Sequence, residues 1–320
     1  MGGVLNALGQ KLAERWLTLL VLPGALFLAT ATAAATLGQA HALDPHRLTD
    51  RITHWIQAPA ATTAGGQVVL LGAVLAASAA AGLMAQGLGV LVQRGTLAPD
   101  WETWPRPLRQ GARARVAVRR TRWNAAAHRY RQQLDADARA LARDGVRADR
   151  AARRAAHEAW RRLAAEEPAR PTWSGDRIHA VSVRLARDHH LDLSVLWPHL
   201  WLVLPDTTRA EITTAEQALT RAVTLAGWAV LYAPLTVWWW PAAPLAAALV
   251  LTARYRIHTA VDTYAQLLEA AARLHVVDLA ASLAIDHTGP VTPALGDALM
   301  QQLRPRTPLA AQHGGGRTER

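Results

Sequence analysis

Residues 68–92 read VVLLGAVLAASAAAGLMAQGLGVLV, a run without one charged side chain. A helix that crosses a bilayer needs about 20 predominantly apolar residues, and this run is long enough. Residues 16–37 form a similar run, and residues 222–253 form a third that is interrupted by Trp238-Trp239-Trp240-Pro241. The sequence therefore predicts an all-α integral membrane protein with about four transmembrane helices: two spans plus a short hairpin.

Small residues dominate the 68–92 run. Gly72, Ala76 and Ala80 are spaced four apart, and Gly82, Gly87 and Gly89 follow. This spacing allows helix backbones to approach closely, as they do in membrane helix pairs, and it predicts packing against the first span. Ser78 and Gln86 are the polar side chains of the run, so packing is favoured over a pore.

Charge predicts the orientation. Residues 39–67 carry only Arg47 and Arg51 as basic residues, whereas residues 94–221 carry 24 Arg and 15 acidic residues. Arginine and lysine collect in cytoplasmic loops, so the 39–67 loop is expected outside and the Arg-rich section inside. A cleavable signal peptide is the alternative interpretation of the first run, since Ala40-His41-Ala42 has the small-residue cleavage pattern.

The whole chain divides into segments on these grounds. The predicted order is a cytoplasmic N-terminal segment (1–15), transmembrane helix 1 (16–38), an extracytoplasmic loop (39–67), transmembrane helix 2 (68–92), a cytoplasmic helical domain (93–221), a transmembrane hairpin (222–253), a cytoplasmic helix (254–287) and a disordered tail (288–320). Both arms of the 222–253 hairpin are short for a full crossing, so it either spans twice or re-enters. With 34 Arg against one Lys, the composition indicates a high-GC bacterium, and hence the plasma (inner) membrane.

Residues 112–167 have the periodicity of a helical hairpin. Apolar side chains follow one stripe with steps of three, four and seven: Val116, Trp123, Ala127, Tyr130, Leu134, Ala138 and Leu141. Ala152, Ala156, Trp160 and Leu163 form the facing stripe. A turn at Gly145 would place Tyr130 opposite Trp160.

Residues 171–206 are predicted to form a connector at the membrane surface. Asp176 is expected to cap a helix that runs to about His190. An apolar face follows: Leu193, Leu196, Trp197, Leu200, Trp201 and Leu204. This face suits either the membrane interface or the cytoplasmic hairpin.

The same connector carries a resemblance. The sequence Pro171-Thr172-Trp173-Ser174-Gly175-Asp176, followed by Leu191-Asp192, Trp197-Pro198-His199-Leu200 and Leu204-Pro205, resembles a segment of multi-spanning bacterial, often actinobacterial, membrane proteins of uncharacterised activity. In that family an arginine is commoner where His199 stands. The resemblance covers about a tenth of the chain; it implies a multi-spanning membrane fold and transfers no catalytic residue.

Catalytic and metal-binding patterns are weak. The chain has no cysteine, which excludes disulfides, thiol nucleophiles and thiolate-held metals. Asp176 and His179 have a spacing that suits two ligands on one helix face, with His189 and His190 nearby, but solvated helix residues explain them better. There is no phosphate loop, HExxH or nucleophile elbow. We therefore expect no enzyme activity, no cofactor and no metal.

The net charge of +11 predicts an anionic partner. Seven arginines just after the second span are expected to contact lipid headgroups: Arg106, Arg109, Arg113, Arg115, Arg119, Arg120 and Arg122. Eight tryptophans are expected to anchor the chain at the membrane interface: Trp16, Trp101, Trp104, Trp197, Trp201, Trp238, Trp239 and Trp240.

Two classes of function fit these features. The first is a membrane-anchored scaffold or adaptor whose Arg-rich domain docks at anionic lipid and recruits an unknown cytoplasmic protein or a second copy of itself. The second is a subunit of a small channel or transporter. A membrane tether for nucleic acid is a distant third, because the arginines of residues 106–131 point to different sides of one helix and lack a recognition fold.

Overall fold

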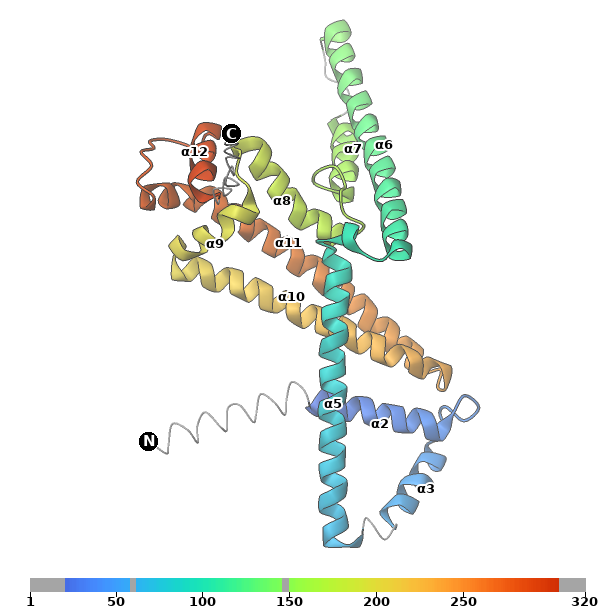
Figure 1. Cartoon of the computed structure of the whole chain (residues 1–320). Coiled ribbons are helices and arrows are strands. Elements are labelled where there is room, and N and C mark those ends of the chain that lie inside the picture. Colours follow the sequence, from blue (N-terminus) through green and yellow to red (C-terminus); the bar gives the residue numbers. More distant parts are fainter. Residues whose placement is uncertain (1–20, 58–61, 146–149, 305–320) are drawn as a thin grey trace, which may run out of the picture. The chain divides into compact units, whose positions relative to one another are not determined.

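The computed structural model describes residues 21–57, 62–145 and 150–304. Every regular element in these ranges is a helix, which confirms the all-α prediction for the described part of the chain (Figure 1). The chain divides into two compact units, residues 1–177 with 213–264 and residues 178–212 with 265–320. Three helices contribute to both units: α8 (Trp173–His189), α10 (Asp206–Tyr232) and α11 (Ala242–Ser282).

Among the described residues, two helices are long and apolar enough to cross a membrane. One is α5 (Ala64–Leu97), and the other is α10 continued by the short helix η3 (Ala233–Val237). The predicted first span is described only from residue 21 onward, as the apolar helix α2 (Leu22–Leu37). The predicted fourth span is the apolar start of α11, which runs on without a break to Ser282. The helix expected at 254–287 is the continuation of this arm and ends at Ser282.

Small residues let α5 pack closely on α2, as predicted, and also on α10, through a face that includes Gly82 and Gly89 of the predicted set. A Cβ atom added to Gly24 of α2 would lie 2.0 Å from the carbonyl oxygen of Ser78, and one added to Gly227 of α10 would lie 2.0 Å from that of Ala85. The buried face of α5 follows helical steps of three and four: Ser78, Ala81, Gly82, Ala85 and Gly89. The predicted Gly72 stripe lies on another side of the helix and is exposed.

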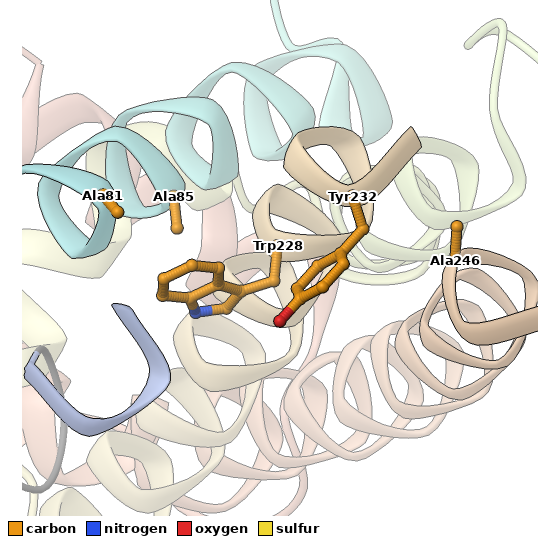
Figure 2. Packing of buried hydrophobic residues seen from close by; sticks show 5 residues of the cluster. All are labelled: Ala81, Ala85, Trp228, Tyr232 and Ala246. Carbon is orange, nitrogen blue, oxygen red and sulfur yellow. The ribbon is translucent and has the colours of Figure 1, made fainter. Parts of the chain in front are cut away.

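Aromatic side chains fill the space beside this crossing. Figure 2 shows Trp228 and Tyr232 of α10 next to Ala81 and Ala85 of α5, with Ala246 of α11 close by. Phe27 of α2 completes the cluster, with its ring edge-on to Tyr232 at 5.3 Å between centroids. Alanines on one helix thus make room for large rings on the next.

The loop predicted at 39–67 contains a helix, α3 (Pro45–Ile56). The carboxylate of Asp44 accepts hydrogen bonds from the backbone N–H groups of His46 and Arg47, which is N-terminal capping. Just before it, the side chain of Gln39 donates to the carbonyl oxygens of Thr236 and Val237 at 3.0 and 2.8 Å.

The tip of the α10–α11 hairpin therefore lies beside the C-terminal end of α2. The side-chain amide oxygen of Gln39 also accepts from the backbone N–H of Trp240 at 3.1 Å. The indole N–H of Trp239 donates to the carbonyl oxygen of Ala42 at 2.9 Å. Four hydrogen bonds thus join the tip to residues 39–42.

The predicted helical hairpin consists of α6 (Arg106–Asp144) and α7 (Arg150–Leu163). Gly145 ends α6 with φ of 67°, in the left-handed region that favours glycine. Tyr130 stacks on Trp160 as expected, with centroids 5.7 Å apart.

The buried stripe of α6 ends earlier than predicted. Leu134, Ala138 and Leu141 are exposed, and Asp137 is buried instead, in an ion pair with Arg153 at 2.6 Å. The stripe prediction fails here because a charged pair occupies the position that faces α7.

The second unit contains α9 (Leu193–Val203) and α12 (Pro293–Leu303) with the adjoining parts of α8 and α11. Leu196 and Leu200 of α9 are fully buried, and Pro198 lies inside this helix. The guanidinium of Arg184 on α8 forms a bidentate ion pair with Glu269 on α11.

The prediction of a disordered tail is wrong for residues 293–303. These residues form α12, which packs against α9 and buries Leu295, Leu299 and Met300. Thr292 caps the helix by accepting from the backbone N–H of Leu295. The prediction of disorder rested on the proline and glycine content of the tail. Pro293, however, lies in the first turn of α12, where proline is favourable. Residues 305–320 of the predicted tail lie outside the described ranges.

Candidate functional site at the end of α5

Residues 168–176 close over the C-terminal end of α5. The Thr172 hydroxyl donates to the carbonyl oxygen of Thr96, and the Arg170 guanidinium donates to that of Ala98 at 2.8 Å. Carbonyl groups at a helix end have no partner within the helix, so these donors satisfy them. A Cβ atom on Gly175 would lie 2.4 Å from the carbonyl oxygen of Leu97, so a glycine is required for this approach.

Asp176 connects this segment to α6. One carboxylate oxygen accepts from the backbone N–H groups of Ala169 and Arg170 at 2.9 and 2.6 Å. The other accepts from the Arg119 guanidinium at 2.6 and 3.2 Å. Asp176 is buried, and a buried carboxylate is stable only with such partners.

Asp176 therefore has a different role from the cap predicted for it. Helix α8 begins earlier, at Trp173, and the Thr172 hydroxyl accepts from the backbone N–H of Gly175 at 3.1 Å. Thr172 thus caps the helix, while Asp176 lies one turn inside it. Both threonine and aspartate favour the N-cap position, so the sequence alone does not distinguish Thr172 from Asp176, and the prediction of Asp176 was wrong.

The predicted interface tryptophans have different environments. Trp101, in the short helix η2 (Trp101–Thr103), is 8% exposed and donates to the carbonyl oxygen of Ala169 at 3.2 Å. Trp101 thus packs inside the junction that residues 168–176 form at the end of α5, which corrects its assignment as an interface anchor. Trp104 is half-buried and packs against it. Trp238 and Trp240 are exposed at the hairpin tip.

Of the remaining predicted anchors, Trp197 and Trp201 are half-buried on α9. Trp239 is half-buried and hydrogen-bonded to the carbonyl oxygen of Ala42. Trp16 lies outside the described residues.

The seven predicted headgroup arginines divide into two groups. Arg119 pairs with Asp176, Arg120 pairs with Glu167 at 2.7 Å, and Arg109 donates to the carbonyl oxygen of Glu102. Arg119 thus has a structural role that replaces the one predicted for it. The other four are exposed and form no ion pair with a described residue: Arg106, Arg113, Arg115 and Arg122.

A second cluster lies beside this site and involves His258 and Asp262, whose spacing in the sequence suits a local helix pair but whose partners lie on α8. Trp173 stacks face to face on His258 of α11, with centroids 4.6 Å apart and planes 5° from parallel. The guanidinium of Arg177 bonds to Asp262 at 2.5 Å. Burial, and then the positive charge of Arg254, lower the pKa of His258.

The His and Asp residues weighed as metal ligands have other contacts. Asp192 caps α9 through Ser194, and hydrogen bonds from Ser194 lower its pKa. His190 lies 3.2 Å from Asp297. In the described ranges no three His, Asp or Glu side chains come together in a way that would hold a metal ion.

Comparison with protein-family models, with curated proteins and with solved structures finds no match for this chain. The resemblance carried by residues 171–205 therefore stays a prediction. What the structure adds is a physical role for this segment: its Thr172, Gly175 and Asp176 hold α5, α6 and α8 together.

Proposed function

We propose that this chain is an integral membrane protein of the bacterial plasma membrane that acts as a scaffold or adaptor. In this proposal about four helices anchor the chain, both termini are cytoplasmic, and the Arg-rich helical domain docks at anionic lipid and recruits a protein partner. The length and composition of α5 and of α10 with η3 support membrane insertion. The junction at Asp176 supports a fixed connection between α5 and the Arg-rich hairpin.

The contacts of Gln39 support two true spans in the 222–253 region over a re-entrant loop. If α2 crosses toward the outside, its C-terminal end lies at the outer surface. The hairpin tip is hydrogen-bonded to residues just after that end. The exposed rings of Trp238 and Trp240 then suit the outer interfacial belt.

One observation carries the partner proposal: near the turn of the α6–α7 hairpin, apolar side chains of α6 are exposed and packed against no other described residue that would bury them. Leu134 and Leu141 are 38% and 44% exposed, although they continue the stripe that Trp123 and Tyr130 bury against α7. Exposed apolar side chains seven residues apart lie on one face of a helix, and such a face is recognised by a partner helix or groove. The uncovered end of the hairpin is thus the proposed recruitment surface.

A photo-crosslinking amino acid tests this surface in the host cell. Placed at Leu141 of the full-length protein, it should yield a defined crosslinked product, and the same group at the exposed Arg129 should not. Leu134→Glu should abolish the product while leaving the helical content unchanged. Random, weak products from both positions would contradict the scaffold proposal.

A cavity among the apolar helices favours channel or transport activity as the alternative. About 710 Å³ lies between α2, α5, α10 and α11, and its polar lining includes Thr30, Gln86 and Thr224. Solute or ion flux through the protein in liposomes, lost in Gln86→Leu, would favour this alternative. The nucleic-acid tether is weakened because Arg119 and Arg120 are paired with acids.

A further inference from the structure

A second cavity, of about 800 Å³, lies in the first unit between α5, α6, the start of α8, α10 and α11. Most of its lining is apolar, and the part between α5, α10 and α11 is aliphatic: Val92, Ala226, Ala229, Val230, Val250 and Ile257. The end formed by α6 and by the cytoplasmic part of α11 is basic, with Arg115, Arg119, Arg122 and Arg254. No acidic residue lines this cavity within the described part of the chain.

The basic residues of this cavity differ from their neighbours in their partners. Arg119 is neutralised by Asp176, and nearby Arg177 is neutralised by Asp262. Arg115, Arg122 and Arg254 form no ion pair with any residue that the structure describes. They are exposed, and all three line a cavity that has no acid among its described lining residues, so the site carries uncompensated positive charge.

We propose that this cavity binds one anionic phospholipid. Its phosphate lies at Arg115, Arg122 and Arg254, and an acyl chain lies along Val230 and Val250. Guanidinium groups recognise phosphate through paired hydrogen bonds, and the stacked Trp173 and His258 form an aromatic wall beside it.

The cavity itself favours a lipid over a soluble anion. A phosphate alone would use only the basic end and leave the aliphatic lining exposed to water, which costs free energy in proportion to its area. The aliphatic lining comes from α5, α10 and α11, the helices proposed to cross the bilayer. A lipid chain reaches it from the membrane, and the volume is within the range of ligand cavities.

Native mass spectrometry of the full-length protein tests the proposal. The protein is purified in a neutral detergent, delipidated and titrated with phosphatidylglycerol or phosphatidylcholine. We expect one phosphatidylglycerol to bind in preference to phosphatidylcholine. Each arginine near an anionic phosphate contributes about five-fold in affinity, so Arg115→Gln/Arg254→Gln should weaken binding by about 25-fold.

Two further variants separate a built site from general surface charge. Arg113→Gln/Arg129→Gln removes the same charge from α6 outside the cavity and should leave the single bound lipid in place. Val230→Trp fills the aliphatic part without changing any charge and should weaken binding. Equal losses in the two arginine pairs, or no effect of Val230→Trp, would overturn the proposal.

Soluble sn-glycerol 3-phosphate distinguishes a lipid from a free phosphate. It should not compete at millimolar concentration, because it lacks the chain; full competition would mean a phosphate site and would overturn the lipid assignment. The lipid site rests on the proposed membrane insertion, but the two proposals can be refuted separately. A membrane-inserted protein without a preferred anionic lipid refutes only the inference, whereas a protein that is not inserted refutes both.

Discussion

Asp176 is the residue on which the junction depends most directly. Its carboxylate receives four hydrogen bonds from three residues, and these residues join the end of α5, α6 and α8. Replacing it leaves the Arg119 guanidinium and two backbone N–H groups without their acceptor. Removal of one member of a buried, hydrogen-bonded pair is among the costly changes that a protein can undergo.

Asp176→Ala should therefore destabilise the protein by about 3 kcal/mol, a figure that allows for the partial exposure of Arg119. Glu158→Ala, which breaks an exposed pair with Arg162 on α7, should have little effect. Thermal unfolding of the two variants in the same detergent provides the comparison. Similar midpoints for both would refute the role given to Asp176.

His258 predicts a pH dependence of stability. Burial and Arg254 lower its pKa in the folded protein. His258 also borders a hollow separate from the proposed lipid cavity, whose charged lining residues are Arg119, Glu158, Arg161, Arg162, Arg177, Arg254 and Asp262. The unfolded chain therefore takes up a proton more readily as the pH falls through about 6.5, the value for a free histidine. Stability contributed by neutral His258 is present above this pH and lost below it.

The wild-type protein should lose more stability between pH 7.5 and 5.5 than His258→Gln does. Chemical denaturation of both proteins at the two pH values measures this difference, and the other histidines cancel in the comparison. Parallel losses in the two proteins would contradict the lowered pKa.

At the scale of elements, α5 packs on α2 and α10 through small residues that allow close backbone approach, rather than through interlocking large side chains. Gly24 and Gly227 bring two other helices to within backbone contact of Ser78 and Ala85. Packing of this kind is specific to position, because one added methyl group collides with a backbone atom that cannot rotate away.

Gly227→Ala should destabilise the α5–α10 contact by about 1–3 kcal/mol. Gly87→Ala is the matched control, since a Cβ atom there meets nothing within 4 Å, and alanine favours a helix. Thermal unfolding should separate the two variants clearly. A destabilised Gly87→Ala with an unchanged Gly227→Ala would mean that α5 packs through its other face.

The α6–α7 hairpin makes a prediction for aromatic packing. Trp160 contacts both Tyr130 and Trp123, so Trp160→Ala should cost about 3 kcal/mol. Arg154→Ala is the appropriate control, since Arg154 is exposed and donates a hydrogen bond to the carbonyl oxygen of Arg150 on its own helix. Arg153 would be a poor control because it pairs with the buried Asp137. Equal effects of the Trp160 and Arg154 changes on unfolding would contradict the stacking.

At the scale of the whole molecule, the sequence predicted structure within one helical hairpin better than it predicted contacts between helices far apart in the chain. The turn at Gly145 and the Tyr130–Trp160 pair follow from helical periodicity and one glycine, and both are present. The contact face of α5 could not be read this way, because several stripes of small residues compete and the partner helix decides between them.

The candidate site was predicted only in part for the same reason. Clustered arginines are visible in the sequence, but which of them are neutralised depends on acids far along the chain, such as Asp176 for Arg119. The basic end of the cavity also needs Arg254, which is 132 positions after Arg122 and reaches it only through the α10–α11 hairpin. Helix α12 was missed because its composition resembles a tail, and its stability comes from α9.

The orientation of the chain in a membrane is the central claim, and the absence of native cysteine allows a direct test. Single cysteines at Thr53 on α3 and at Ala243 beside the hairpin tip should react with an impermeant maleimide added outside intact cells. A cysteine at Ala155 on α7 should react only after the membrane is broken. Labelling of Ala155 in intact cells, or protection of Thr53, would contradict the proposed orientation, and protection of Ala243 alone would mean a re-entrant hairpin.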